Sequence, residues 1–241
     1  MNRDLKHILV LDIETVSAFQ NFADLSAALQ DHWRRKAQFI RNENESSTED
    51  LYFDRSAIYA EFGRIIVIAV AIFHEIENGE YGLRVTSFQD DDEHKLLSAF
   101  SDFLNAKFDP DQVAFCAHNG KEFDYPYLCR RLLVNGIRIP KALDIAEKKP
   151  WEINHLDTMD MWKFGDRKSF TSLDLLTSLF GIDSSKSDID GSQVNRVYYE
   201  EEDGLSRIAE YCRGDVVATA QVFLKLSSLP IIKQSHITIV S

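Results

Sequence analysis

The chain lacks any long run of apolar residues. No stretch approaches the roughly 20 residues that cross a bilayer. The segment from Met1 to His7 is charged and has no apolar signal core. We therefore expect a soluble, cytoplasmic protein that has no membrane partner.

Cysteine is also scarce, with only Cys116, Cys129 and Cys212 in 241 residues. No two of them have the CxxC spacing that is typical of zinc sites. We expect three reduced thiols in the core rather than a metal centre built on sulfur.

Basic residues are outnumbered, since 27 lysines and arginines face 39 aspartates and glutamates, for a net charge of −12. Proteins that capture nucleic acids over long distances are usually basic. The charge remains compatible with an enzyme that gathers carboxylates around a metal and accepts short or flexible strand ends. One basic cluster, from Trp33 to Lys36, either contacts a nucleic-acid backbone or is a solvated helix face.

The apolar pattern, with 44 % hydrophobic residues, predicts one α/β domain over residues 1–241. Strands are expected at 7–11, 64–73, 82–88, 112–117, 155–161 and 231–240. Helices are expected at 23–40, 92–107, 124–135, 172–180 and 202–226. Polar loops are expected at 42–50 and 184–195, with an inserted or mobile segment around 41–55. This order favours a mixed sheet of five or six strands flanked by helices.

A first pair of acids, Asp12 and Glu14, follows the apolar run His7–Leu11, which we expect to stop at Asp12. Residues two apart in an extended chain share a face. Two carboxylates held together repel each other, and a hard cation such as Mg²⁺ would relieve the repulsion. The alternative is two solvated carboxylates where the strand leaves the sheet.

Two further motifs carry acids. The stretch HNGKEFD ends at Asp124, between a strand and a helix, where Asp124 is either a site residue or a helix cap. Tyr211 and Asp215 lie four apart in a long predicted helix, so they share a face. Asp215 is followed by two valines and is costly to bury unless it is paired or metal-bound; otherwise it lies on the polar side of the helix.

Together these motifs resemble the DEDDy branch of the DEDD exonuclease superfamily, which has the ribonuclease-H-like fold. Asp12 and Glu14 match its D-x-E motif, and Tyr211 and Asp215 match its Tyr-x-x-x-Asp motif. The middle motif is matched by Asn119, Phe123 and Asp124.

The stretches EFGRI at 61–65, DGSQV at 190–194 and EYCRGDV at 210–216 resemble a stand-alone bacterial group related to the exonuclease domain of family B DNA polymerases. Residues 19–59 match least.

The resemblance implies a metal-dependent 3′→5′ exonuclease that acts on single-stranded DNA ends, with DNA repair as its setting. It implies two divalent cations, Mg²⁺ or Mn²⁺, held by Asp12, Glu14, Asp124 and Asp215, with Tyr211 orienting water. It leaves open RNA as the substrate, or a non-catalytic nucleic-acid-binding module. Protein partners are not indicated.

Several other residues have open interpretations. Thr15, Asn119 and Phe123 are candidates to bind substrate; turn chemistry for the first two, and core packing for Phe123, explain them equally well. Lys186, Ser192 and Gln193 lie on a polar loop that could hold phosphates. Asp157 and Asp160 fit no metal motif, so we expect structural hydrogen bonds there.

Overall fold

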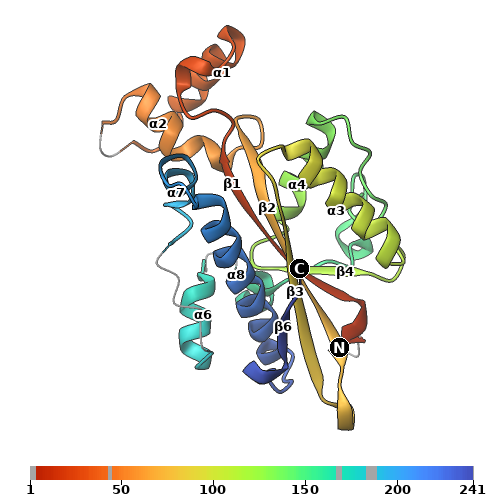
Figure 1. Cartoon of the computed structure of the whole chain (residues 1–241). Coiled ribbons are helices and arrows are strands. Elements are labelled where there is room, and N and C mark those ends of the chain that lie inside the picture. Colours follow the sequence, from red (N-terminus) through yellow and green to blue (C-terminus); the bar gives the residue numbers. More distant parts are fainter. Residues whose placement is uncertain (1–3, 43–44, 167–169, 183–188, 241) are drawn as a thin grey trace.

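The computed structural model describes residues 4–42, 45–166, 170–182 and 189–240. Six strands form one mixed sheet in the order β5-β4-β1-β2-β3-β6, with helices on both faces (Figure 1). The strands are β1 (Ile8–Ser17), β2 (Gly63–Glu75), β3 (Tyr81–Gln89), β4 (Ala114–Ala117), β5 (Leu156–Asp157) and β6 (Ile237–Ile239). The helices are α1 (Ala27–Ala37), α2 (Thr48–Arg55), α3 (Glu93–Lys107), α4 (Asp124–Val134), α5 (Thr158–Lys163), α6 (Leu173–Phe180), α7 (Val194–Glu200) and α8 (Gly204–Leu226). The predicted mixed α/β sheet is confirmed.

Strand β1 lies inside the sheet, antiparallel to β2 and parallel to β4. Its side chains alternate between two cores, as the pleat requires. Leu9, Leu11 and Ile13 pack in the core with α3 and α4, whereas Val10 and Val16 pack in the core with α8. Asp12 and Glu14 share the parity of Val10, so the alternation places both acids on the α8 face.

A third apolar cluster lies beyond the end of β1, where α1 and α2 pack together (Figure 1). Trp33 is fully buried there and its indole Nε1 donates to the carbonyl of Thr48 at 3.1 Å. Ser47 caps α2, because its hydroxyl accepts from the amide of Asp50. The predicted loop at 42–50 is therefore wrong over its last three residues, and residues 48–55 of the expected inserted or mobile segment are helical.

Other element boundaries also differ from the predictions. Strand β1 continues past Asp12 to Ser17, because β2 pairs with it throughout. The strand expected at 155–161 is only β5, Leu156–Asp157, because the Asp157 side chain caps α5. The loop expected at 184–195 ends where α7 begins, at Val194. The helix expected at 23–40 is confined to α1, after a short 3-10 turn.

Two expectations from the scarce residue classes can be compared with the structure. All three cysteines are free, with Cys116 and Cys212 buried and Cys129 half-buried, in agreement with the expected core thiols. Across the ranges given above, no helix is long and apolar enough to cross a membrane.

Candidate active site

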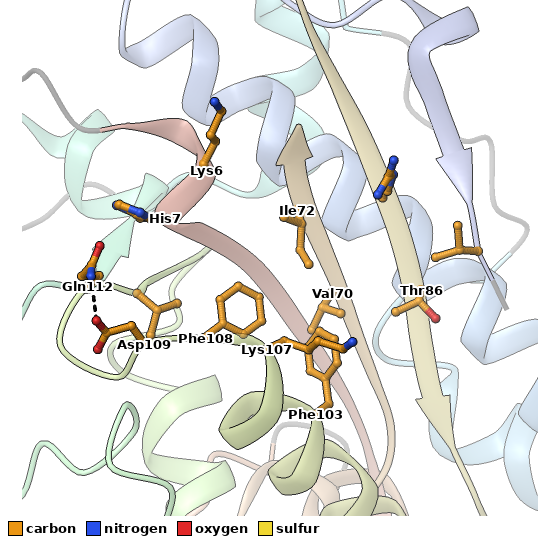
Figure 2. A pocket seen from close by; sticks show the side chains of 13 residues that line it. Lys6, His7, Val70, Ile72, Thr86, Phe103, Lys107, Phe108, Asp109 and Gln112 are labelled. Carbon is orange, nitrogen blue, oxygen red and sulfur yellow. Dashed lines mark hydrogen bonds between the residues drawn. The ribbon is translucent and has the colours of Figure 1, made fainter. Parts of the chain in front are cut away.

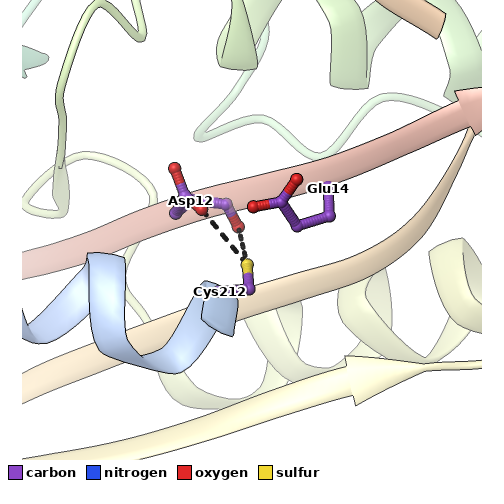
Figure 3. Close-up of side chains that lie close together, drawn as sticks. All are labelled: Asp12, Glu14 and Cys212. Atoms are coloured by element: carbon purple, nitrogen blue, oxygen red, sulfur yellow. Dashed lines mark hydrogen bonds between the residues drawn. The ribbon is translucent and has the colours of Figure 1, made fainter. Parts of the chain in front are cut away.

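Asp12 and Glu14 lie on β1 beside Cys212 of α8 (Figure 3). One potential ligand atom from each of these three side chains lies within 4.8 Å of the other two. The Cys212 thiol donates to Asp12 Oδ2 at 3.2 Å. The strand pleat thus sets two carboxylates side by side, and α8 closes over them.

Asp124 reaches the same strand from the direction of β4. Strand β4 ends at Ala117 and pairs only with residues 8–10 of β1, so the next part of that β1 edge has no strand partner in β4. Asp124, the first residue of α4, takes that place: its Oδ1 accepts from the amide of Ile13 at 3.2 Å. The early end of β4 therefore makes room for a third carboxylate between Asp12 and Glu14 along the chain.

Helix α8 supplies Tyr211 and Asp215 from consecutive turns. The Tyr211 hydroxyl donates a hydrogen bond to the Asp215 carboxylate, as the four-residue spacing allows. Burial, followed by the charges of Asp215 and Glu14, raises the pKa of the Tyr211 phenol above its ordinary value. Tyr211 is therefore neutral and suited to donate or accept hydrogen bonds.

The four carboxylates gather at one place, where Glu14 and Asp124 are buried and Asp12 and Asp215 are half-buried. Burial, followed by the charges of Asp124, Glu14 and Asp215, raises the pKa of Asp12 well above its usual range. Burial and then the charge of Asp215 do the same to the pKa of Glu14. Burial raises the pKa of Asp124 to about 7 and that of Asp215 to about 6. Among the described residues, no lysine, arginine or histidine forms an ion pair with any of the four.

This environment fits a divalent cation. Buried carboxylates that repel one another are stabilised when a positive charge lies between them. Carboxylate oxygens are the preferred ligands of Mg²⁺ and Mn²⁺. The Cys212 thiol is protonated, since burial and the charge of Asp12 raise its pKa. Cys212 is thus a donor to Asp12 rather than a thiolate ligand.

The three candidate substrate residues are near the acids along the chain, since Thr15 follows Glu14 and Phe123 precedes Asp124, with Asn119 in the preceding turn. The Thr15 hydroxyl donates to the carbonyl of Ala57 at 2.9 Å. Asn119 is a turn residue with φ of 64°, and its amide donates to Asp157 Oδ1 at 3.0 Å. Phe123 is half-buried and its ring lies 5.3 Å from that of Tyr127. Each has a structural contact, so the packing and turn interpretations have direct support.

Asp157 has the structural role that the sequence predicted. Its carboxylate accepts from the amides of Asn119, Lys121, Met159 and Asp160, at 3.0 to 3.3 Å. Asp160 forms ion pairs with Lys121 and Lys163. Asp157 thereby fixes the turn that leads into Asp124.

Two of the polar-loop residues can be located. Ser192 and Gln193 precede α7 and line a cavity with α2; Lys186 lies outside the described residues. The basic cluster is divided, because Trp33 is buried while the Arg34 guanidinium pairs with Asp31 at 2.7 Å. Neither group contacts the carboxylates.

Sequence reasoning identified Cys212 only as a core thiol. Its place three residues before Asp215 puts it on the same helix face, which is the signal that could have linked it to the acids. Its hydrogen bond to Asp12 makes it a positioning residue of the centre.

A separate cavity of about 630 Å³ lies beside β2, β3 and the end of α3 (Figure 2). Val70, Ile72 and Phe103 line it, with Lys107 on the same wall. None of the four acids lines this cavity, so its chemistry is distinct from that of the carboxylate centre.

Comparison with known proteins agrees with this geometry. The chain resembles, over 90 % of its length, the family B DNA polymerase of the hyperthermophilic archaeon Pyrobaculum calidifontis, with 18 % identity and a TM-score of 0.54. It spans 24 % of that polymerase, and the likeness shows the ribonuclease-H-like fold.

Residues 57–231 match the family described as a predicted 3′-5′ exonuclease related to the exonuclease domain of PolB. The matched range contains Asp124, Tyr211 and Asp215, whereas β1 contributes Asp12 and Glu14 from outside it. Because the match covers well over half of the sequence, the chain belongs to this family of 3′-5′ exonucleases related to the PolB exonuclease domain.

Proposed function

We propose that the protein removes nucleotides from the 3′ ends of single-stranded DNA and releases nucleoside 5′-monophosphates, using two divalent cations, Mg²⁺ or Mn²⁺. The observation that carries this proposal is the group of four buried and half-buried carboxylates, which no cationic side chain among the described residues balances.

The residues fit the cations by position and by chemistry. Asp12 would be the central ligand of the cations, because the charges of Asp124, Glu14 and Asp215 all act on its carboxylate. Glu14, Asp215 and Asp124 would complete the set of ligands. When bound, a metal pair supplies Lewis acidity that activates water and stabilises the leaving 3′-oxygen.

Tyr211 would orient the attacking water. Its pKa lies above the ordinary phenol value, so the hydroxyl keeps its proton at neutral pH. The hydrogen bond to Asp215 fixes the direction of that hydroxyl. Tyr211 therefore positions the nucleophile by hydrogen bonding and does not remove its proton.

Thr15, Asn119 and Phe123 would form the site of the terminal nucleotide. Thr15 directly follows Glu14 on β1, and Phe123 directly precedes Asp124. The half-buried Phe123 ring could stack on a base, a contact that tolerates any sequence. The hydroxyl of Thr15 already donates to the carbonyl of Ala57, so the backbone of Thr15 is the more available group for binding the nucleotide.

Digestion of end-labelled oligonucleotides tests the reaction. Single-stranded DNA, double-stranded DNA and RNA, each labelled at the 3′ or the 5′ end, are incubated with Mg²⁺ or Mn²⁺. We expect mononucleotides to be released from the 3′ end of single-stranded DNA. We expect Asp12→Asn and Asp215→Asn to lower the rate by roughly 10³-fold or more. Wild-type activity in either folded variant would refute the assignment.

Two alternatives have distinct results. Faster digestion of RNA than of DNA would identify an exoribonuclease with the same chemistry. A non-catalytic nucleic-acid-binding module would bind no Mn²⁺ in calorimetric titration and digest neither polymer. Retention of all four carboxylates and of Tyr211 favours the enzyme.

A further inference from the structure

A polar cavity of about 540 Å³ lies between α2 and the start of α7. Its lining includes Arg41, Arg55 and Arg196, against one acid, Asp54. This local excess of positive charge occurs in a chain whose net charge is −12. The cavity therefore offers an anion a favourable environment that the chain as a whole does not.

The cavity is joined to the strand that carries the acids. Asn195 lines the cavity, and its Oδ1 accepts from both the amide and the hydroxyl of Ser17, at 2.8 and 3.0 Å. Its Nδ2 donates to the carbonyl of Phe53 in α2 at 2.8 Å. Asn195 thus fixes α7 and α2 against the end of β1, as their neighbouring positions in Figure 1 show.

The distance along β1 is short. Ser17 is three residues beyond Glu14, which is about 10 Å in an extended strand. Phe19 follows with 45 % of its surface exposed, and its amide donates to the Tyr52 hydroxyl at 3.3 Å. Phe19 is thereby tied to α2, the helix that contributes Leu51, Phe53 and Arg55 to the cavity. Exposed aromatic rings and basic side chains bind single strands, by base stacking and phosphate contacts.

We propose that the polynucleotide upstream of the reacting 3′ end passes Phe19 and enters this cavity, where Arg55 and Arg196 bind its phosphates. This proposal rests on the proposed function and adds the path of the substrate strand. A dinucleotide at the carboxylates would not reach the cavity, whereas a longer oligonucleotide would. The cavity thereby makes the affinity depend on substrate length.

The two arginines are suitable for substitution. Both are exposed, and Arg196 pairs with Glu200 at a distance of 3.7 Å, which is a weak surface contact. Arg55→Glu/Arg196→Glu reverses the charge, and Arg55→Gln/Arg196→Gln removes it with less disturbance of the end of α2. Lys107→Glu/Arg138→Glu is the matched control, because it changes the net charge equally at exposed positions that do not line this cavity.

The test measures kcat and KM for oligo(dT) of two to twelve nucleotides. For the double glutamate variant we expect KM for the twelve-nucleotide substrate to rise roughly tenfold, with kcat and the dinucleotide KM unchanged. The double glutamine variant should show a smaller increase in the same direction. The slope of log(kcat/KM) against log salt should become shallower by roughly 1.4, for two lost single-strand phosphate contacts. Equal KM changes at all lengths, or the same change in the control, would overturn the proposal.

Direct binding separates this proposal from the proposed function. Anisotropy of fluorescein-labelled oligo(dT) of twelve nucleotides is measured in EDTA, where no hydrolysis occurs. Wild-type binding that the double glutamate variant loses supports the strand path, even if the wild type hydrolyses nothing. Unchanged binding in that variant overturns the path, even if the wild type is an active exonuclease.

Discussion

The single buried carboxylate of Glu93 and the four acids around β1 are treated in opposite ways in this protein. Glu93 of α3 accepts from the amide of Ile65, from both Nε and Nη2 of Arg131, and from Nδ2 of Asn135. The four acids around β1 receive two backbone amides, those of Ile13 and Asp124, with one phenol and one thiol. Arg131 balances the charge of Glu93, whereas no cationic side chain in the described part of the chain balances the four acids.

The difference indicates what each group is for. Glu93 joins β2, α3 and α4, and the Arg131 guanidinium continues to the carbonyl of Ala60, so this network holds elements together. Among the described residues, no ion pair joins the β1 acids to another element, and their mutual repulsion destabilises the fold. A cation bound between them would offset this repulsion and stabilise the folded state.

The largest effect on stability is expected when Glu93 loses the positive charge of Arg131. Arg131→Met leaves the Glu93 carboxylate buried without its cation, and we expect the free energy of unfolding to fall by about 3–5 kcal/mol. Activity per folded molecule should be unchanged. Urea unfolding in EDTA measures the loss. The matched variant is Asp124→Asn, which relieves repulsion at the acids and should raise the free energy of unfolding of the metal-free protein. If this free energy fell in both variants, the contrast between Glu93 and the β1 acids would be wrong.

The next effect is the pH dependence of the metal-free protein. The folded pKa values of about 7 for Asp124 and about 6 for Asp215 lie above those of the unfolded chain. A raised carboxyl pKa means that the folded state is favoured at low pH and loses stability as pH rises through that range. We expect the free energy of unfolding in EDTA to fall by about 4 kcal/mol between about pH 5 and about pH 8.

Saturating Mn²⁺ should remove most of this slope, because the bound ion favours the ionised carboxylates. Thermal unfolding at several pH values, with EDTA or Mn²⁺, measures both arms. The same slope in both would show that no cation binds at these acids. Asp124→Asn should flatten the slope in EDTA, which ties the effect to this centre.

The contrast between the two groups was only half visible in the sequence. The period of two on β1 predicted that Asp12 and Glu14 share a face, and the period of four on α8 predicted the same for Tyr211 and Asp215; both hold in the structure. The pattern did not reveal that Arg131 balances Glu93, since they lie 38 residues apart on different helices. Nor did it reveal that β1 continues to Ser17, because that length depends on pairing with β2.

Long-range pairing also explains the role of Asp124. Its position at the start of α4 was expected, but the amide it accepts from belongs to Ile13, 111 residues away. That contact exists because β4 is short, which local propensity does not specify. The local motifs thus indicated the candidate residues, while the tertiary contacts determine how each is held.

A smaller effect is expected from Tyr211→Phe, which keeps the ring and removes the hydroxyl that is bonded to Asp215. We expect kcat to fall by roughly 10–100-fold through loss of water positioning, with KM little changed. Steady-state kinetics on single-stranded DNA measures both constants. Because Tyr211 keeps its proton, the remaining activity should depend on pH as the wild-type activity does. If the wild-type activity rose towards alkaline pH and the variant lost that rise, the phenol would instead be identified as a base.

The smallest effect concerns Cys212, which separates positioning from ligation at the acids. Its thiol donates to Asp12 at 3.2 Å, so Cys212→Ala should loosen Asp12 and lower Mn²⁺ affinity by roughly tenfold. Cys212→Ser retains a donor and should restore most of that affinity, as calorimetric titration would measure. If Cys212 were a ligand, the wild type would prefer Cd²⁺ to Mn²⁺, since thiolates favour the softer ion, and the serine variant would not have that preference. A serine variant as weak as the alanine variant would contradict the donor role, and the balance of the β1 acids would then rest on the cations alone.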